Sequence, residues 1–207
     1  MAWSLATYLD RLSSLLNDAT QLSFSTAALT DALRQALHEY STQLPIEQQT
    51  TLTLTSDRRE IDVSSIADLV NVTEVWLPYA ADDDTYPAYH RKFRYWPDLK
   101  LIYLTDGDPP ASGDTVRIFY TQQHTINGLD AAAITSVPDV HAWLIVRGAA
   151  AIAVNSRALT EGQRRIQDWA DKQYHLFTAN LAVIARIGQG DPFARQPNLD
   201  RYERDWG

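Results

Sequence analysis

The side chains that could do acid–base, nucleophilic or metal chemistry are scattered along this chain and form no recognisable motif. No two histidines have the H-x-x-x-H spacing that places two imidazoles on one face of a helix, and none accompanies a G-x-S-x-G nucleophile elbow. His124, in an expected loop, is interpreted as a polar residue that hydrogen-bonds locally. We therefore expect the chain not to be an enzyme. The histidines are His38, His90, His124, His141 and His175.

The clustered acidic residues and the paired glycines have ordinary interpretations too. A calcium loop alternates its ligands and needs a glycine for its sharp turn, whereas Asp82, Asp83 and Asp84 are consecutive. They are interpreted as a solvated loop tip, and Asp106-Gly-Asp108 as turn chemistry. Gly188-Gln-Gly190 lacks the third glycine of a dinucleotide fingerprint and follows a helix. Because the chain also has no cysteine, no cofactor and no bound metal are expected.

Aromatic residues gather in the middle of the chain. Such a concentration occurs in carbohydrate-binding platforms, but aromatic side chains also fill small sheets and protein interfaces. A core or interface role is favoured, and a glycan-binding or hydrolytic module stays an alternative. The residues concerned are Trp76, Tyr79, Tyr86, Tyr89, Tyr95 and Trp96.

Composition indicates a globular protein that does not bind nucleic acid by charge. The 207 residues are 45% hydrophobic and 21% charged, and no apolar run approaches the roughly 20 residues that cross a bilayer. No basic region precedes the first apolar residues, so we expect no secretory signal, synthesis in the cytoplasm and no membrane association. The net charge of −8 disfavours binding to phosphates. It is compatible with a protein that lets DNA pass without specific contacts.

The elements that must position any site begin with two helices. Apolar residues recur at helical spacing from Leu5 to Leu16, which predicts an amphipathic helix that ends near residues 17–18. Ser25 is the expected N-cap of a second helix, with Phe24 packing on Leu29. Pro45 stops that helix. The two helices are expected to form an antiparallel hairpin.

From residue 50 to residue 120 the apolar period changes from helical to alternating. The alternation and the intervening turns predict about six short strands in a small antiparallel sandwich or barrel-like sheet. The expected strands contain Leu52 and Leu54, then Ile61 and Val63, then residues 70–77, 90–96, 99–104 and 115–120.

Two more helices and a tail complete the expected order. Ser136 is the expected cap of a helix whose first turn holds Pro138. A capping box at Thr160 and Gln163 predicts the start of a last helix that ends at Gly188. The expected fold class is α+β, with an antiparallel β-domain inserted into a helical bundle. Its predicted parts are residues 1–48 (helical hairpin), 49–124 (β-domain), 125–188 (helices that complete the bundle) and 189–207 (extended tail).

The helix over residues 140–154 is apolar on nearly every side. Only His141 and Arg147 can carry charge there, and such a helix must be covered all round. One interpretation is the central core helix of a monomer. The other is a helix partly buried between subunits; the pattern alone leaves the two about even, and the family resemblance given below favours the second. The interface residues then expected are Trp143, Arg147, Gly148, Ala150 and Ala151.

The order of several segments resembles the neck adaptor, or head-to-tail connector, proteins of tailed bacteriophages. The resemblance starts at Trp3-Ser-Leu-Ala-Thr-Tyr-Leu-Asp and Leu15-Leu-Asn-Asp-Ala, and continues through residues 61–70 and 100–110 and Gly113-Asp-Thr-Val-Arg-Ile-Phe-Tyr. It ends with residues 120–130 and the Gly- and Ala-rich helix. The resemblance implies a structural virion protein of the neck, in a homo-oligomeric and commonly dodecameric ring between the portal protein and the next neck or tail protein, with a channel for DNA. A tail or capsid accessory ring protein of different symmetry is an alternative.

The tail after Gly188 carries isolated aromatic and arginine side chains between two prolines. Pro192 and Pro197 argue against regular structure, and the aromatic residues suit anchoring to a partner. With the resemblance, the portal is the expected partner. The residues are Phe193, Arg195, Arg201, Tyr202, Arg204 and Trp206.

Overall fold

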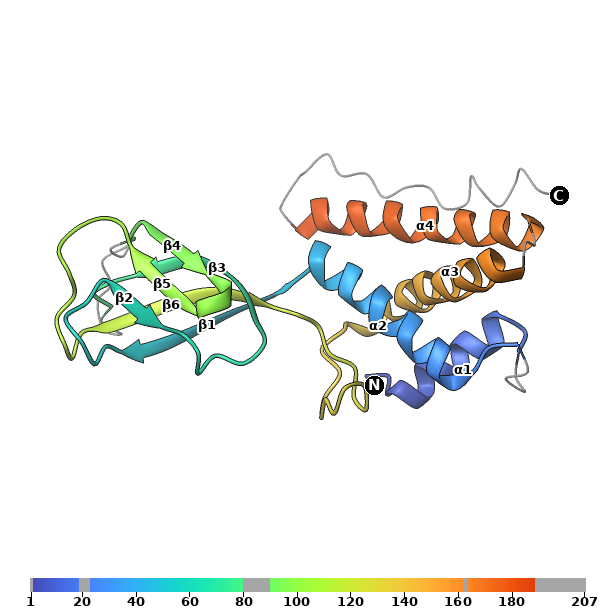
Figure 1. Cartoon of the computed structure of the whole chain (residues 1–207), viewed down its shortest axis with the longest axis horizontal. Coiled ribbons are helices and arrows are strands. Elements are labelled where there is room, and N and C mark those ends of the chain that lie inside the picture. Colours follow the sequence, from blue (N-terminus) through green and yellow to red (C-terminus); the bar gives the residue numbers. More distant parts are fainter. Residues whose placement is uncertain (1, 19–22, 80–89, 162–163, 189–207) are drawn as a thin grey trace. The chain divides into compact units, whose positions relative to one another are not determined.

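A computed structural model describes residues 2–18, 23–79, 90–161 and 164–188, and it confirms the α+β class (Figure 1). The chain forms two compact units. A helical unit comprises the chain up to Leu44 and from His124 onward, and a β-unit comprises Pro45–Gln123. The chain therefore crosses between the units twice.

The helical unit begins with α1 (Leu5–Leu15) and α2 (Thr26–Gln43). The side chain of Ser4 accepts a hydrogen bond from the Thr7 N–H at the start of α1, and Ser25 does the same for the Ala28 N–H at the start of α2. The expected Ser25 cap is thereby confirmed. Between the helices, the Asp18 carboxylate accepts hydrogen bonds from two backbone N–H groups, those of Ser23 and Phe24.

A short 3₁₀ helix, η2 (Asp139–His141), leads into α3 (Ala142–Glu161), and α4 (Arg164–Gly188) follows it. The expected cap at Ser136 is wrong, because the Ser136 hydroxyl lies in the preceding loop and accepts from the Thr125 N–H at 2.8 Å. The expected helix start at Thr160 is also wrong, because α3 continues to Glu161.

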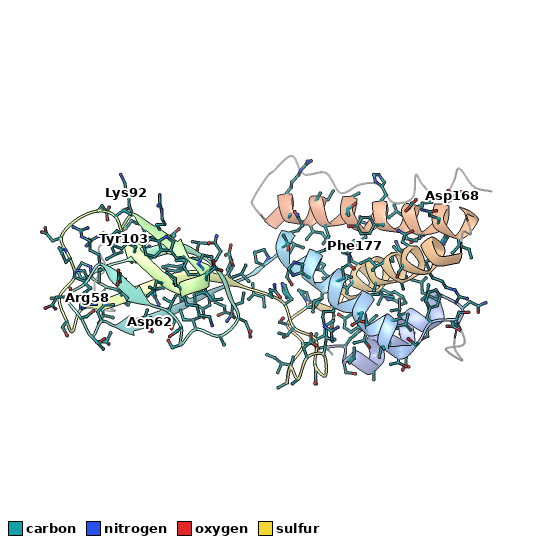
Figure 2. The ribbon with its side chains drawn as sticks, viewed as in Figure 1. Arg58, Asp62, Lys92, Tyr103, Asp168 and Phe177 are labelled. Atoms are coloured by element: carbon teal, nitrogen blue, oxygen red, sulfur yellow. The ribbon has the colours of Figure 1, made fainter. Side chains whose placement is uncertain are left out.

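Helix α3 is the centre of the helical unit. It packs against α1, α2 and α4, and Figure 1 shows α3 and α4 side by side. A Cβ added at Gly148 would lie 2.9 Å from the Phe177 ring, which points from α4 toward α3 (Figure 2). Ala149, Ala150 and Ala151 are fully buried around this contact. Small side chains are thus what allows α4 to approach α3 so closely.

The β-unit holds six short strands among its described residues, as the alternating pattern predicts. One antiparallel sheet has the order β1-β6-β3, from β1 (Ile46–Thr53), β6 (Thr115–Gln122) and β3 (Leu69–Trp76). The other has the order β2-β5-β4, from β2 (Glu60–Asp62), β5 (Leu101–Leu104) and β4 (Phe93–Trp96). A 3₁₀ turn, η1 (Pro97–Leu99), joins β4 to β5.

Both sheets contribute to one apolar core. Ile61 and Ile102 from one sheet and Val75 and Ile118 from the other belong to the same buried cluster. That cluster shares no residue with the core of the helical unit. Each unit therefore has its own interior, and the β-unit is a small sandwich.

We expect Gly148→Ala to destabilise the helical unit by about 1–3 kcal/mol, the usual cost of overpacking a tight core. The cause is the 2.9 Å approach to the Phe177 ring. Chemical denaturation followed by circular dichroism measures the change. In a Phe177→Leu background the same substitution should cost less, because the ring that it meets is gone. An equal cost in both backgrounds would contradict the contact.

Candidate subunit interface

Three exposed apolar side chains lie close together in the sequence, in the loop before η2, in η2 and in the first turn of α3. Ile134 is 69% exposed, Val140 is 84% exposed and Trp143 is 46% exposed. Single exposed apolar residues are ordinary on a protein surface, whereas contiguous ones mark interaction sites. Of these three side chains, Trp143 has a contact with a further apolar ring, that of Trp3. We refer to Trp3, Ile134, Val140 and Trp143 as the apolar patch.

Trp3 connects α1 to this patch. Its ring lies edge-on to the Trp143 ring, with centroids 5.6 Å apart, and edge-on to the Tyr8 ring at 5.4 Å. The Arg11 guanidinium lies 5.9 Å from the Trp3 ring and 6.0 Å from the Trp143 ring, a cation–π arrangement. The patch is therefore apolar with a basic residue above its two indole rings.

The loop of residues 124–137 is held in place on both sides of Ile134. The Thr135 hydroxyl donates to the Trp3 carbonyl at 2.6 Å and accepts from the Asn127 N–H at 2.8 Å. The Thr125 hydroxyl donates to the Ile134 carbonyl at 3.0 Å. Since the backbone around Ile134 is fixed, its exposed side chain has a defined position on the surface.

A second anchor joins the same loop to α2. The Arg34 guanidinium donates to both carboxylate oxygens of Asp130, at 2.9 Å and 2.6 Å, in a bidentate ion pair. This pair holds the pKa of Asp130 below its ordinary value. Asp130 itself has a φ of 49°, in the left-handed region that aspartate tolerates better than most residues.

Two half-buried histidines and the buried Tyr40 form a polar cluster in the helical unit. The Tyr40 hydroxyl lies 2.6 Å from His141 Nδ1, and the Tyr40 ring packs edge-on against the His124 ring at 5.0 Å. His124 Nε2 lies 2.9 Å from the Leu44 carbonyl, and its Nδ1 lies 3.3 Å from the Ser136 hydroxyl. A neutral His124 satisfies both contacts, with Nε2–H as donor and Nδ1 as acceptor. His124 is thus a hydrogen-bonded residue, as interpreted from sequence, but its side-chain partners Leu44 and Ser136 are not local in the sequence.

Burial shifts the titration of this cluster. Desolvation lowers the pKa of His124 and of His141, and the neighbouring His141 lowers that of His124 further. Desolvation also raises the pKa of Tyr40 to about 12. The titratable groups that face the cluster from the surrounding elements are Tyr8 on α1 and Asp139 on η2. Both histidines are therefore neutral near pH 7.

The acidic turn of the β-unit is structural. Arg91 Nε donates to an Asp106 carboxylate oxygen at 3.1 Å, and its Nη2 donates to the carbonyls of Asp106 and Asp108. Gly107 has a φ of 60°, and a Cβ there would lie 2.6 Å from the same guanidinium. The expected turn role of Asp106-Gly-Asp108 is confirmed.

Neither a metal cluster nor a membrane span appears in the part of the chain that the structure describes. No group of three metal-ligating side chains comes together there. None of its helices is long and apolar enough to span a bilayer. The run Asp82 to Asp84 lies outside the described residues.

The expected interface residues divide into two groups. Trp143 and Arg147 are exposed, as an interface requires. Gly148, Ala150 and Ala151 are buried in the core of their own subunit. The expectation that these three residues lie between subunits is therefore corrected. A charge at Ala150 is then expected to unfold the helical unit, and a test of assembly must use other positions. The six expected tail residues lie outside the described residues.

Sequence reasoning missed most of the apolar patch. Trp3 and Arg11 reach it only through the packing of α1 beside α3, which no local pattern reveals. Ile134 and Val140 carried a signal, because both are apolar residues in the polar stretch around Ser136 and Pro138. The local conformation of a polar loop does not require an apolar residue.

These features define an α+β protein with an inserted β-unit and an apolar patch on its helical unit. No family model matches the chain, and no curated protein matches it. Among solved structures it is similar to a chain from the neck of an empty GTA particle, computed with C6 symmetry. The two are 21% identical with a TM-score of 0.31, over 72% of this chain and 76% of the other. That degree of likeness assigns the chain to no family.

We expect the helical unit to lose stability as the pH falls below about 6.5, the ordinary pKa of histidine in an unfolded chain. The folded pKa values of His124 and His141 are lower, so below that pH the unfolded chain binds more protons than the folded one. Each histidine contributes at most about 1.4 kcal/mol per pH unit, down to its folded pKa.

Denaturant unfolding between pH 7.5 and pH 5.5 measures this dependence. The double variant His124→Gln, His141→Gln is the control, and its pH dependence should be flatter than that of the parent chain. A parent chain that becomes more stable over the same fall in pH would contradict the neutral state of the cluster.

Proposed function

We propose that this chain is a structural virion protein that forms a ring in the neck of a tailed bacteriophage, between the portal protein and the tail. The order of segments that resemble neck adaptors supports the proposal. The observation that carries it in the structure is the apolar patch, because a subunit that acts alone has little use for Trp143 and Val140 in solvent.

In the proposed ring, the patch of each subunit packs against the next subunit. A closed ring repeats one heterologous contact, so a substitution in the patch acts at every joint. Arg147 is exposed on the same helix as Trp143, one turn further along, and Arg11 lies above the indole rings. Arginine and tryptophan are both enriched at the energetic centres of interfaces. The joint is therefore an apolar contact with two basic residues that a carboxylate on the neighbour would complement.

DNA passes through the proposed ring without specific contacts. The net charge of −8 supports this part of the proposal, because binding to duplex DNA depends on an excess of Lys and Arg against phosphates. Passage without retention is what a neck channel requires.

The matched pair Ile134→Glu and Ile166→Glu tests the ring. Both isoleucines are exposed on the helical unit, at 69% and 42%, so neither variant should lose much stability. Ile166 lies near the start of α4, away from the patch. We expect Ile134→Glu to reduce incorporation into necks by about tenfold or more, because a carboxylate would be desolvated at each joint. Ile166→Glu should assemble like the parent chain.

Quantitative mass spectrometry of purified particles gives the incorporation, and melting temperatures confirm that both variants fold. Electron-microscopy class averages of necks give the number of subunits in the ring. Normal incorporation of both Ile134→Glu and Trp143→Glu would refute the patch as the joint. A chain that stays monomeric in particles would refute the ring itself.

The tail is proposed to bind the portal through its aromatic and arginine side chains. Each buried aromatic could contribute about 2 kcal/mol, so several anchors together offset the entropy of ordering a 19-residue segment. We expect a chain truncated after Gly190 to keep its melting temperature within a few degrees and to fail to join portal-containing heads. A large loss of thermal stability with attachment preserved would instead place the tail in the core of its own subunit.

A further inference from the structure

Among the described strands, the two sheets of the β-unit have four at their edges, and three of these are protected against pairing with another chain. Strands β2 and β4 are short, with three and four residues. Strand β3 has irregular pairing with β6, with register shifts between Leu69 and Asn71 and between Val72 and Glu74. Short strands and bulges are two of the devices that prevent edge-to-edge association.

Strand β1 has none of these devices. It is eight residues long and pairs with β6 in unbroken register, from Ile46 opposite Gln122 to Thr53 opposite Thr115. It contains no lysine and no proline, and Glu47 is its single charge. Among the described strands it is bonded to β6 alone, so every second residue presents its N–H and C=O groups at the outer edge.

We propose that this edge pairs with the same strand of a second copy of the chain, antiparallel and about a two-fold axis at Gln49. The pairing is a strand addition, in which main-chain hydrogen bonds join two sheets edge to edge. It would produce a continuous sheet with three strands from each copy.

The side chains of β1 fit this register. A two-fold axis perpendicular to the sheet does not exchange the two faces of the sheet. Two residues paired across the axis must therefore have side chains on the same face, which requires that their residue numbers add up to an even number. With Gln49 opposite Gln49, the half-buried Ile46 lies opposite the half-buried Leu52. The exposed Glu47 lies opposite Thr51, and Gln48 lies opposite Thr50. No like charges face each other, and apolar groups meet apolar groups.

This inference goes beyond the proposed function and does not depend on it. A two-fold contact joins two copies and cannot by itself close a ring, so it is a contact different from the joint at the apolar patch. A failed test of the ring leaves the strand pairing intact, and a failed test of the pairing leaves the ring intact.

Two lysine substitutions on one face of β1 test the pairing. In the proposed register Gln49→Lys places two ammonium groups opposite each other, whereas Thr51→Lys places each ammonium opposite Glu47. Both positions are exposed, so both variants should fold. The mass in solution, measured by light scattering over a concentration series, should show the parent chain passing from 23.3 kDa to twice that mass. Gln49→Lys should weaken the pairing about fivefold, and Thr51→Lys should leave it unchanged or tighten it.

Single cysteines check the register in a chain that has no cysteine of its own. Gln49→Cys should form a disulfide-linked pair under mild oxidation. Thr53→Cys, on the same face, should not, because its counterpart would lie about 26 Å along the strand. A parent chain that remains monomeric up to about 1 mM would overturn the proposal. So would equal pairing by the two lysine variants, or cross-linking through residue 53 in place of residue 49.

Discussion

The central position of α3 is the constraint on which the rest of the helical unit depends. One helix contacts α1, α2 and α4, so most of its surface has no room for bulky or charged groups, and Arg147 lies on the exposed remainder. Gly148 and the buried alanines after it meet this constraint, because they let the Phe177 ring sit against the backbone of α3. Larger residues would separate the helices and open voids that the surrounding leucines could not fill. The apolar patch begins where this packing ends, at the exposed Trp143 in the first turn of the same helix.

Much of the fold could be predicted from sequence because its signals are local. The cap at Ser25, the stop at Pro45 and the alternation in the middle of the chain depend on neighbours a few residues away. The Gly- and Ala-rich helix was the harder case. Its pattern shows that it must be covered, but burial by its own chain and burial by another subunit require the same residues. Only the packing of Phe177 on Gly148 distinguishes them, and that contact joins residues far apart in sequence.

The candidate interface was less predictable than the fold for the same reason. Trp143 could be chosen from sequence because it is an aromatic residue on an apolar helix. Its partners Trp3 and Arg11 come from the other end of the chain. The loop that presents Ile134 is fixed by hydroxyl groups of Thr125 and Thr135, residue types that occur in any loop. A surface assembled from residues 3–11 and residues 134–143 leaves only a weak trace in either segment.

The chain leaves the helical unit after Leu44 and returns to it at His124, and these two points are close together in each unit. On the helical side, His124 bonds the Leu44 carbonyl, and on the β side, Ile46 pairs with Gln122. The two ends of the inserted segment are therefore about one strand spacing apart, roughly 5 Å. A gap of that size can be closed by a turn of a few residues, so the helical unit needs the insertion for neither its connectivity nor its core. The β-unit is in this sense a separable insertion, because a short turn in its place would leave the bundle with the same connectivity and the same core.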